Sequence, residues 1–172
     1  MRIAAYIAVV VILFASYALF NGGFVGGTLV DKGERDEIAR VEKDDPDMAI
    51  VFREARESLP EFLALARDPR PSATNLAVKI AIPAGNSNEY FWLAPFEPRG
   101  EKFAGRINNT PRMAKQVKFG QIVEFTEGEI VDWLYMEDGK MRGNFTACAL
   151  LKHEPPDQAE AMKKQFELSC DP

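Results

Sequence analysis

Two neighbouring β-strands are indicated by Leu76-Ala77-Val78-Lys79-Ile80-Ala81-Ile82 and, after the turn residues Pro83 and Gly85, by Glu89-Tyr90-Phe91-Trp92-Leu93-Ala94. β-Branched and aromatic side chains dominate both runs, which is typical of strands bounded by Pro and Gly. Four more strand-like runs follow, at residues 102–107, 121–126, 130–136 and 141–151. Short turn sequences separate the last three at the spacing of β-hairpins. Six short strands joined by tight turns predict an antiparallel sheet, which could curl into a small partial barrel.

Helices are predicted before and after this sheet. Apolar residues recur at helical spacing over residues 46–59, and a second short helix is expected to begin at Pro60. One helical turn is predicted over residues 110–117, and a final helix from Pro155 to about Leu168. The predicted fold class is therefore α+β, with a small antiparallel sheet flanked by helices.

The N-terminus carries a solidly apolar run, residues 3–20, within a segment that has no charge up to Val30. As a helix this run would span roughly 27 Å, close to the ~30 Å of a bilayer core, so it predicts a transmembrane helix. The alternative is a secretory signal that is cleaved after Ser16-Tyr17-Ala18. The expected divisions are a membrane anchor or signal (1–30), a charged spacer (31–44), an α+β domain (45–152), and a C-terminal helix and tail (153–172).

The flanking charges give opposite indications of the side on which the domain lies. Arg2 alone precedes the apolar run, as in export signals, whereas several basic residues follow it between positions 32 and 43. We expect a single-pass membrane protein, held through residues 3–20, whose C-terminal domain is periplasmic. The alternative is a protein secreted after signal cleavage. Cys148 and Cys170 fit export, because they could pair in an oxidising compartment; otherwise they are unrelated thiols.

The composition excludes several function classes. The chain has 172 residues and a formal net charge of −5, with one His and two Cys. Nucleic-acid-binding proteins need a basic footprint, so no nucleic-acid partner is expected. The His and Cys content is too small for a His/Cys metal site, and no Gly-rich phosphate motif is present. We therefore expect no metal and no cofactor.

Asp132-Trp133 is the first candidate for a functional site. The two-residue period of a strand places Ile130, Asp132 and Leu134 on one face, so the carboxylate lies among apolar neighbours. A buried carboxylate must be paired, hydrogen-bonded or shifted in pKa. Asp132 is therefore either a general acid or base in a pocket, or a structural residue that binds turn amides or pairs with Arg106 or Arg142.

The other candidates also have a functional and a structural interpretation. Glu89 with Asp132 would form a two-carboxylate hydrolytic site if the distance allowed it. Asn108 and Asn109 would bind a ligand, or would satisfy backbone groups in a turn. The aromatic clusters around Trp92 and Trp133 would stack on a planar ligand, or would belong to the core.

The order of these motifs resembles one bacterial family. The motifs are Val78-Lys79-Ile80, Glu89-Tyr90-Phe91-Trp92-Leu93, Phe103-Ala104-Gly105-Arg106-Ile107-Asn108-Asn109-Thr110-Pro111, Lys118-Phe119-Gly120-Gln121-Ile122-Val123 and Ile130-Val131-Asp132-Trp133-Leu134-Tyr135, then Gly139-Lys140, Gly143 and Thr146. Together they resemble the YegJ-like family, domain of unknown function 2314, over about residues 44–152. The resemblance implies a single α+β domain and supplies no activity.

The expected function is a membrane-tethered domain that binds an unknown protein or small-molecule partner and catalyses no reaction. One alternative is a small hydrolase that uses Asp132 and Glu89. Another is an immunity- or stress-type interaction protein facing the cytosol, which reversed topology would favour.

Overall fold

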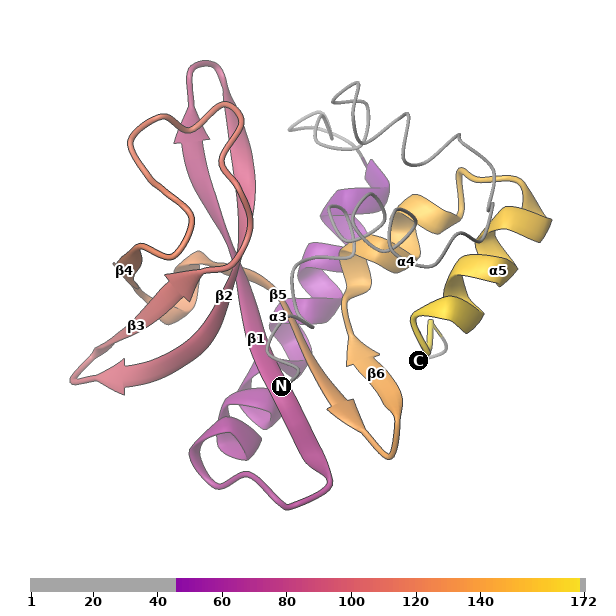
Figure 1. Ribbon diagram of the computed structural model, residues 1–172, viewed down its shortest axis with the longest axis horizontal. Helices are drawn as coiled ribbons and strands as arrows, with labels where there is room; N and C mark the ends of the chain where they lie inside the picture. The colour runs from indigo at the N-terminus through magenta and orange to yellow at the C-terminus, as the bar shows by residue number, and fades with distance from the viewer. Residues whose placement is uncertain (1–45, 171–172) are drawn as a thin grey trace, which may run out of the picture.

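The computed structural model describes residues 46–170 as a six-stranded sheet packed with helices (Figure 1). In chain order the elements are α3 (Pro46–Arg67), β1 (Ala73–Ala84), β2 (Ser87–Arg99), β3 (Lys102–Ile107), β4 (Ile122–Phe125), the 3₁₀-helix η1 (Glu127–Glu129), β5 (Ile130–Glu137), β6 (Lys140–Gly143), α4 (Phe145–Leu151) and α5 (Pro156–Gln165). The predicted α+β class is confirmed.

The strands lie in the order β4-β3-β2-β1-β5-β6, and every neighbouring pair is antiparallel. The prediction of a six-stranded antiparallel sheet is therefore confirmed. The two edge strands, β4 and β6, do not pair with each other, so the sheet is open. The sheet therefore does not close into a complete barrel.

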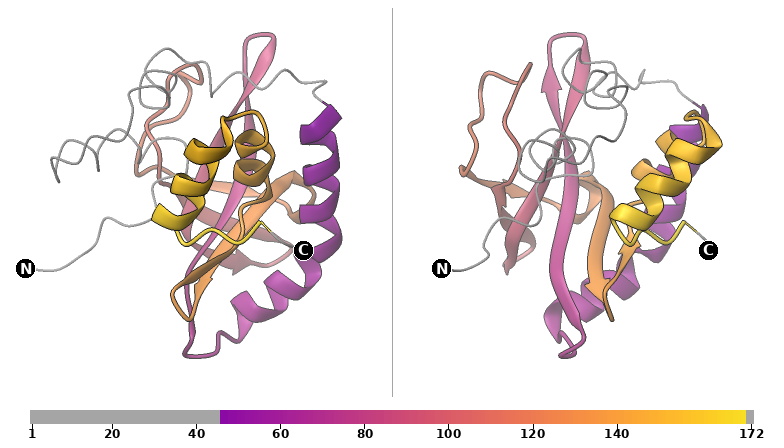
Figure 2. Two further views of the ribbon diagram at one scale, coloured as in Figure 1. Left: turned by 90° about the vertical axis from the view of Figure 1, so that its right-hand side faces the viewer. Right: turned by 45° about the vertical axis from the view of Figure 1, so that its right-hand side comes forward.

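Helix α3 covers one face of the sheet, which we call the α3 face, and forms the main core with it (Figure 2). Its apolar stripe includes Ala55, Leu59 and Phe62, which recur at helical spacing and are buried. The sheet residues of this core include Val78, Ile80, Phe91, Leu93 and Trp133. Trp133 also fixes the helix by a polar contact, since its Nε1 donates to the carbonyl of Ala55 at 2.9 Å.

Helix α3 is a single helix, so the predicted break at Pro60 is wrong. The helix instead bends part-way along its length (Figure 2), as a proline that lacks its N–H and crowds the preceding turn requires. Ser58 caps no new helix; its Oγ donates to the carbonyl of Glu54 at 2.8 Å. Phe62 and Leu63 lie beyond the proline and are buried in the same core, so packing holds the two halves together.

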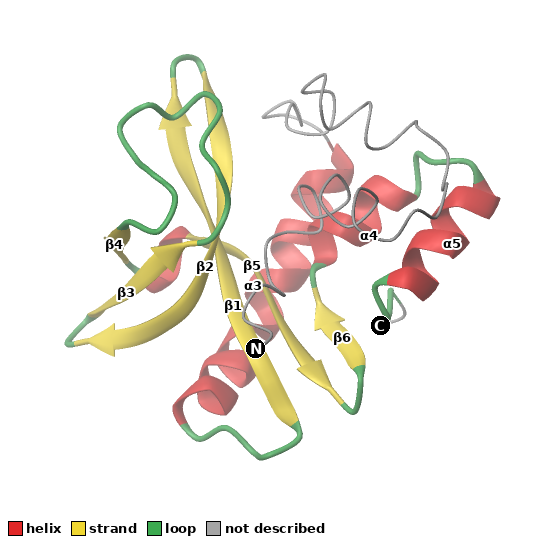
Figure 3. Cartoon of the chain, in the orientation of Figure 1, coloured by secondary structure: helices red, strands yellow, loops and turns green. Residues whose placement is uncertain are grey.

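The strand predicted over residues 141–151 is wrong in its second part, which forms α4 (Figure 3). Asn144 has a φ of +56° and turns the chain away from the sheet. The first two amides of the helix, those of Phe145 and Thr146, then donate to the carboxylate of Asp132. A distant side chain therefore supplies the start of this helix.

Two other helix predictions also need correction. Residues 110–117 form a loop and no helical turn, because the carboxylate of Glu89 accepts the amides of Arg112, Met113 and Ala114. The final helix ends at Gln165, earlier than predicted.

The end of the described chain is fastened to both the sheet and α4. A disulfide joins Cys148 on α4 to Cys170, with their Cα atoms 5.5 Å apart. Met141 of β6 donates to the carbonyl of Glu167 at 2.7 Å and accepts from the amide of Ser169 at 3.3 Å. Residues 167–170, the C-terminal segment, therefore lie along β6, the strand at this edge of the sheet.

The predicted anchor (3–20) and charged spacer (31–44) lie outside the described residues. Within residues 46–170, no helix is both long and apolar enough to cross a membrane.

Candidate functional site

The candidate site lies on the face of the sheet that points away from the main core, which we call the far face. Lys79, in the middle of β1, is paired with Asp132 of β5 on one side and with Trp92 of β2 on the other. Directly opposite residues of antiparallel strands project to the same face. The three side chains therefore form one row across the sheet, and all three are buried.

The carboxylate of Asp132 is filled by donors from its own fold. Oδ1 accepts the amides of Trp133 at 2.8 Å and Phe145 at 3.1 Å. Oδ2 accepts the amide of Thr146 at 2.9 Å and its hydroxyl at 2.6 Å. An ionised carboxylate has about four lone-pair positions. Asp132 thus binds turn amides, and it has no oxygen left for a substrate or an attacking water.

Lys79 supplies the positive charge beside this carboxylate. Its Nζ lies 3.8 Å from Oδ2 of Asp132, donates to Oγ1 of Thr146, and lies 4.3 Å from the centroid of the Trp92 ring. Burial lowers the pKa of Lys79 from 10.5 to about 8, and the charge of Asp132 acts in the opposite direction. Thr146 bridges the two charges, because its hydroxyl accepts from Lys79 and donates to Asp132.

The cation partners expected for Asp132 were Arg106 and Arg142, and the structure places neither beside it. Arg106 donates to the carbonyl of Gly120 at 3.0 Å, and Arg142 lies 3.9 Å from Glu137. The expectation that Ile130 shares a face with Asp132 is also wrong. The register between β1 and β5 shifts between Lys79 and Ile80, so that Ile130 enters the main core.

Glu89 and Asp132 do not form a common site. Glu89 lies on β2 three residues before Trp92, so the two side chains project to opposite faces of the sheet. Trp92 shares the far face with Asp132, which places Glu89 on the α3 face. There its two oxygens accept three loop amides at 2.7 to 2.9 Å. The two-carboxylate geometry of a glycosidase, about 5–9.5 Å, needs both groups on one side of a substrate.

Asn108 and Asn109 extend the β2 ladder past the end of β3. The amide of Asn108 donates to the carbonyl of Trp92 at 2.9 Å. The side chain of Asn109 accepts from the amide of Trp92 at 2.9 Å and donates to the carbonyl of Tyr90 at 3.2 Å. Asn109 thus takes the place of a peptide group, and it is buried. Of its two predicted roles, Asn109 therefore has the structural one, in which it satisfies backbone groups.

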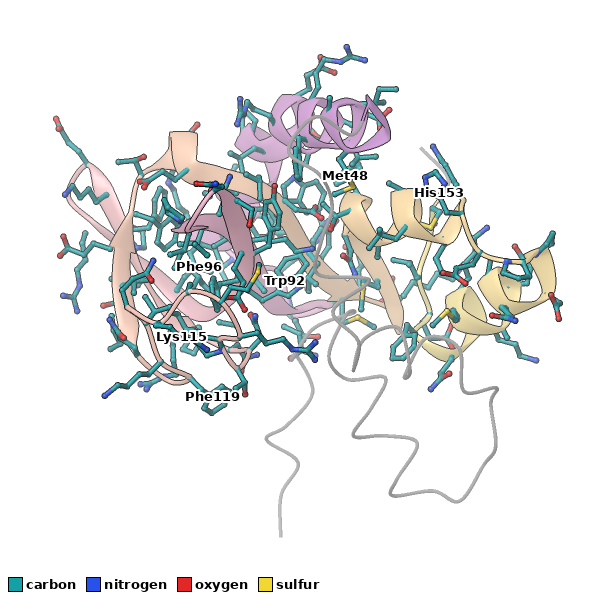
Figure 4. All side chains as sticks on the ribbon, turned by 90° about the horizontal axis from the view of Figure 1, so that it is seen from above. Met48, Trp92, Phe96, Lys115, Phe119 and His153 are labelled. Atoms are coloured by element: carbon teal, nitrogen blue, oxygen red, sulfur yellow. A yellow bond between two sulfur atoms is a disulfide. The ribbon has the colours of Figure 1, made fainter. Side chains whose placement is uncertain are left out.

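The two tryptophans lie on opposite faces. Trp133 stacks on Phe62 with ring centroids 4.9 Å apart and meets Phe145 edge-on at 5.3 Å. Trp92 is buried on the far face, and no hydrogen-bond partner reaches its Nε1. Figure 4 labels Trp92 within the body of the domain. Neither ring is open to stack on a ligand, since both are under 10% exposed.

Lys79 and Thr146 belong to this charge cluster but were absent from the candidates. The sequence could have identified Lys79, because a charged residue within an otherwise apolar strand must find a partner. Thr146 was named only as part of the family resemblance, and its polar role was not predicted, since the helix that positions it is itself started by Asp132. Within residues 46–170, no three His, Cys, Asp or Glu side chains are grouped to hold a metal ion.

Comparison with known proteins places the chain among bacterial relatives. A family model described as an uncharacterised protein conserved in bacteria, DUF2314, matches residues 44–169, which include α5 and most of the C-terminal segment. The uncharacterised protein YegJ of Escherichia coli strain K12 is 28% identical over 119 residues, which cover 69% of this chain and 76% of YegJ. No solved structure matches the chain.

Proposed function

The chain belongs to the bacterial DUF2314 family, and we propose that it is a membrane-tethered, non-catalytic interaction domain that works outside the cytoplasm. Residues 3–20 provide the tether in this proposal, and the described domain meets the partner.

The observation that carries the proposal is the disulfide between Cys148 and Cys170. These are the two cysteines of the sequence, and both are used in the bond. Disulfides form and persist in oxidising compartments and are rare in the bacterial cytoplasm. The bond therefore supports a periplasmic domain over a cytosol-facing one. Together with the apolar run at residues 3–20, it is the second indication of export.

The bonding of the candidate residues supports a role without catalysis. Asp132 accepts four hydrogen bonds from protein donors, and Glu89 accepts three from loop amides. The side chain of Asn109 makes two hydrogen bonds to the backbone of β2. A general acid or base must reach a proton on a substrate at about 2.6–3.2 Å. These groups are instead committed to holding strands, loop and helix together, so the geometry favours binding over hydrolysis.

The test is the intact mass of the full chain from cells whose free thiols are blocked before lysis. A full-length mass with no blocking group, and with two groups added after reduction, supports a tethered and exported domain. Loss of the N-terminal apolar run would show that the protein is secreted after cleavage and is not tethered to the membrane. Two blocking groups without reduction would place the domain in the cytosol and refute its export.

A further inference from the structure

An exposed aromatic turn follows the loop that leads to β4. Phe119 is 62% exposed and Ile122 is 53% exposed, the two highest values among large apolar side chains of the described residues. Phe119 occupies the second position of a tight turn, Lys118–Gln121, and Ile122 begins β4. Figure 4 shows Phe119 at the outer margin of the domain.

The turn is held firmly although its apolar side chain is in water. The amide of Gln121 closes it on the carbonyl of Lys118 at 3.1 Å, and Gly120 has the φ of +79° that the third position of a type II turn requires. Two backbone bonds fasten it to β3: Gly120 donates to Ile107 at 2.8 Å, and Ile107 donates to Gln121 at 2.9 Å. Arg106 adds a bond to the carbonyl of Gly120 at 3.0 Å.

Basic residues predominate in the segment that contains this turn, although the exposed Glu101 and Glu124 flank it. Residues 102–123 contain five Lys or Arg and no Asp or Glu, although the whole chain has a net charge of −5. Lys115, Lys118 and Arg106 are exposed, and Arg106 is the cross-strand partner of Ile122. An exposed aromatic ring with flanking cations combines apolar insertion with attraction to negative charge.

We propose that the turn Lys118–Gln121, with Ile122, docks on an anionic phospholipid surface. Phe119 enters the interface between headgroups and acyl chains, while Lys115, Lys118 and Arg106 contact the phosphates. This inference rests on the tether of the proposed function, which keeps the domain beside a bilayer. It does not depend on the side of the membrane, so it is tested separately from export.

The shape and the strand edge favour lipid over a protein strand. A protruding ring needs a fluid surface or a preformed hole, and a bilayer accepts any such protrusion. Addition of a partner strand to β4 would find an edge of four residues, Ile122–Phe125. That edge also carries Glu124, which lies 3.8 Å from Lys102. Short and charged edges are poor templates for pairing.

The experiment places a photo-crosslinking phenylalanine analogue at position 119 of the full chain. A matched probe stands at position 140, which is also exposed but is the first residue of β6, at the opposite edge of the sheet. Each protein is reconstituted in vesicles of phosphatidylcholine, with or without phosphatidylglycerol, irradiated, and weighed by mass spectrometry. A far-ultraviolet circular dichroism spectrum equal to that of the unmodified chain verifies that each variant is folded.

We expect the probe at 119 to gain the mass of a phospholipid, at least fivefold more often with phosphatidylglycerol than without it. Probe 140 should gain none. Each cation near an anionic surface contributes about fivefold to binding, so K115E with K118E should reduce the adduct about 20-fold or more. Equal adducts at positions 119 and 140, or equal yields in both vesicles, would overturn the proposal. An adduct to a protein, and not to lipid, after irradiation of cells would also overturn it.

Discussion

Replacement of Asp132 by Asn tests whether the far-face charge cluster is a structural element. The substitution turns one acceptor into a donor, although both oxygens accept from protein donors. It also leaves the buried Lys79 without its counter-charge, 3.8 Å away. Removal of one partner from a buried ion pair typically costs about 3–5 kcal/mol. We therefore expect Asp132→Asn to lower the free energy of unfolding by about 3–5 kcal/mol.

The assay is urea unfolding of the full chain in mild detergent at pH 7, followed by far-ultraviolet circular dichroism. Asp138→Asn is the matched control, because Asp138 is exposed and has a φ of +50°, which Asn adopts readily. This control should stay within about 0.5 kcal/mol of the unmodified chain.

A double-mutant cycle with Lys79→Met separates the ion pair from the other bonds. Residues that share a network show coupling of about 0.5–3 kcal/mol, so the double variant should lose less than the sum of the two single losses. A loss below about 1 kcal/mol for Asp132→Asn, the size of one ordinary hydrogen bond, would refute the reasoning. Additive losses would show that Lys79 and Asp132 do not act as a pair.

Three further predictions concern other parts of the fold. The pKa of Lys79 is about 8 in the folded chain and 10.5 in the unfolded chain, so the unfolded state binds more protons between these pH values. The free energy of unfolding should therefore rise by about 3 kcal/mol from pH 7 to 10.5, relative to that of Lys79→Met. Parallel urea titrations of the two proteins measure this difference. Replacement of Cys148 and Cys170 by Ser should lower the free energy of unfolding by about 3 kcal/mol, from the loop entropy of a 22-residue separation, and unchanged stability would contradict this. Glu89→Gln should cost about 1–3 kcal/mol and speed hydrogen exchange at Arg112, Met113 and Ala114, while exchange in α5 stays unchanged.

The strands were largely predictable because their pattern is local. Residues 102–107 and 130–136 are short runs with apolar and aromatic residues between turn residues, and β3 and β5 occupy these positions. The burial of Asp132 also followed from alternation. The position of Ile130 did not, because a register shift between two strands leaves no mark in either sequence.

The errors arose where a distant side chain decides the local structure. The short apolar run after Asn144 suits a strand or a helix equally well, and Asp132 selects the helix by accepting its first amides. The segment after Thr110 has a helix-capping residue, yet Glu89 takes the amides that would start the helix. Such bonds join residues 13 to 25 positions apart, beyond the reach of propensity or periodicity.

The C-terminal segment has a consequence for self-association. A free strand edge is a template on which other chains polymerise, and natural sheets cover such edges or keep them short. Residues 167–169 cover the edge of β6 by backbone bonds to Met141, and the disulfide at Cys170 keeps them in place. The bond that fastens the chain end therefore also keeps neighbouring molecules apart. Its reduction would change the colloidal behaviour of the protein as well as its stability.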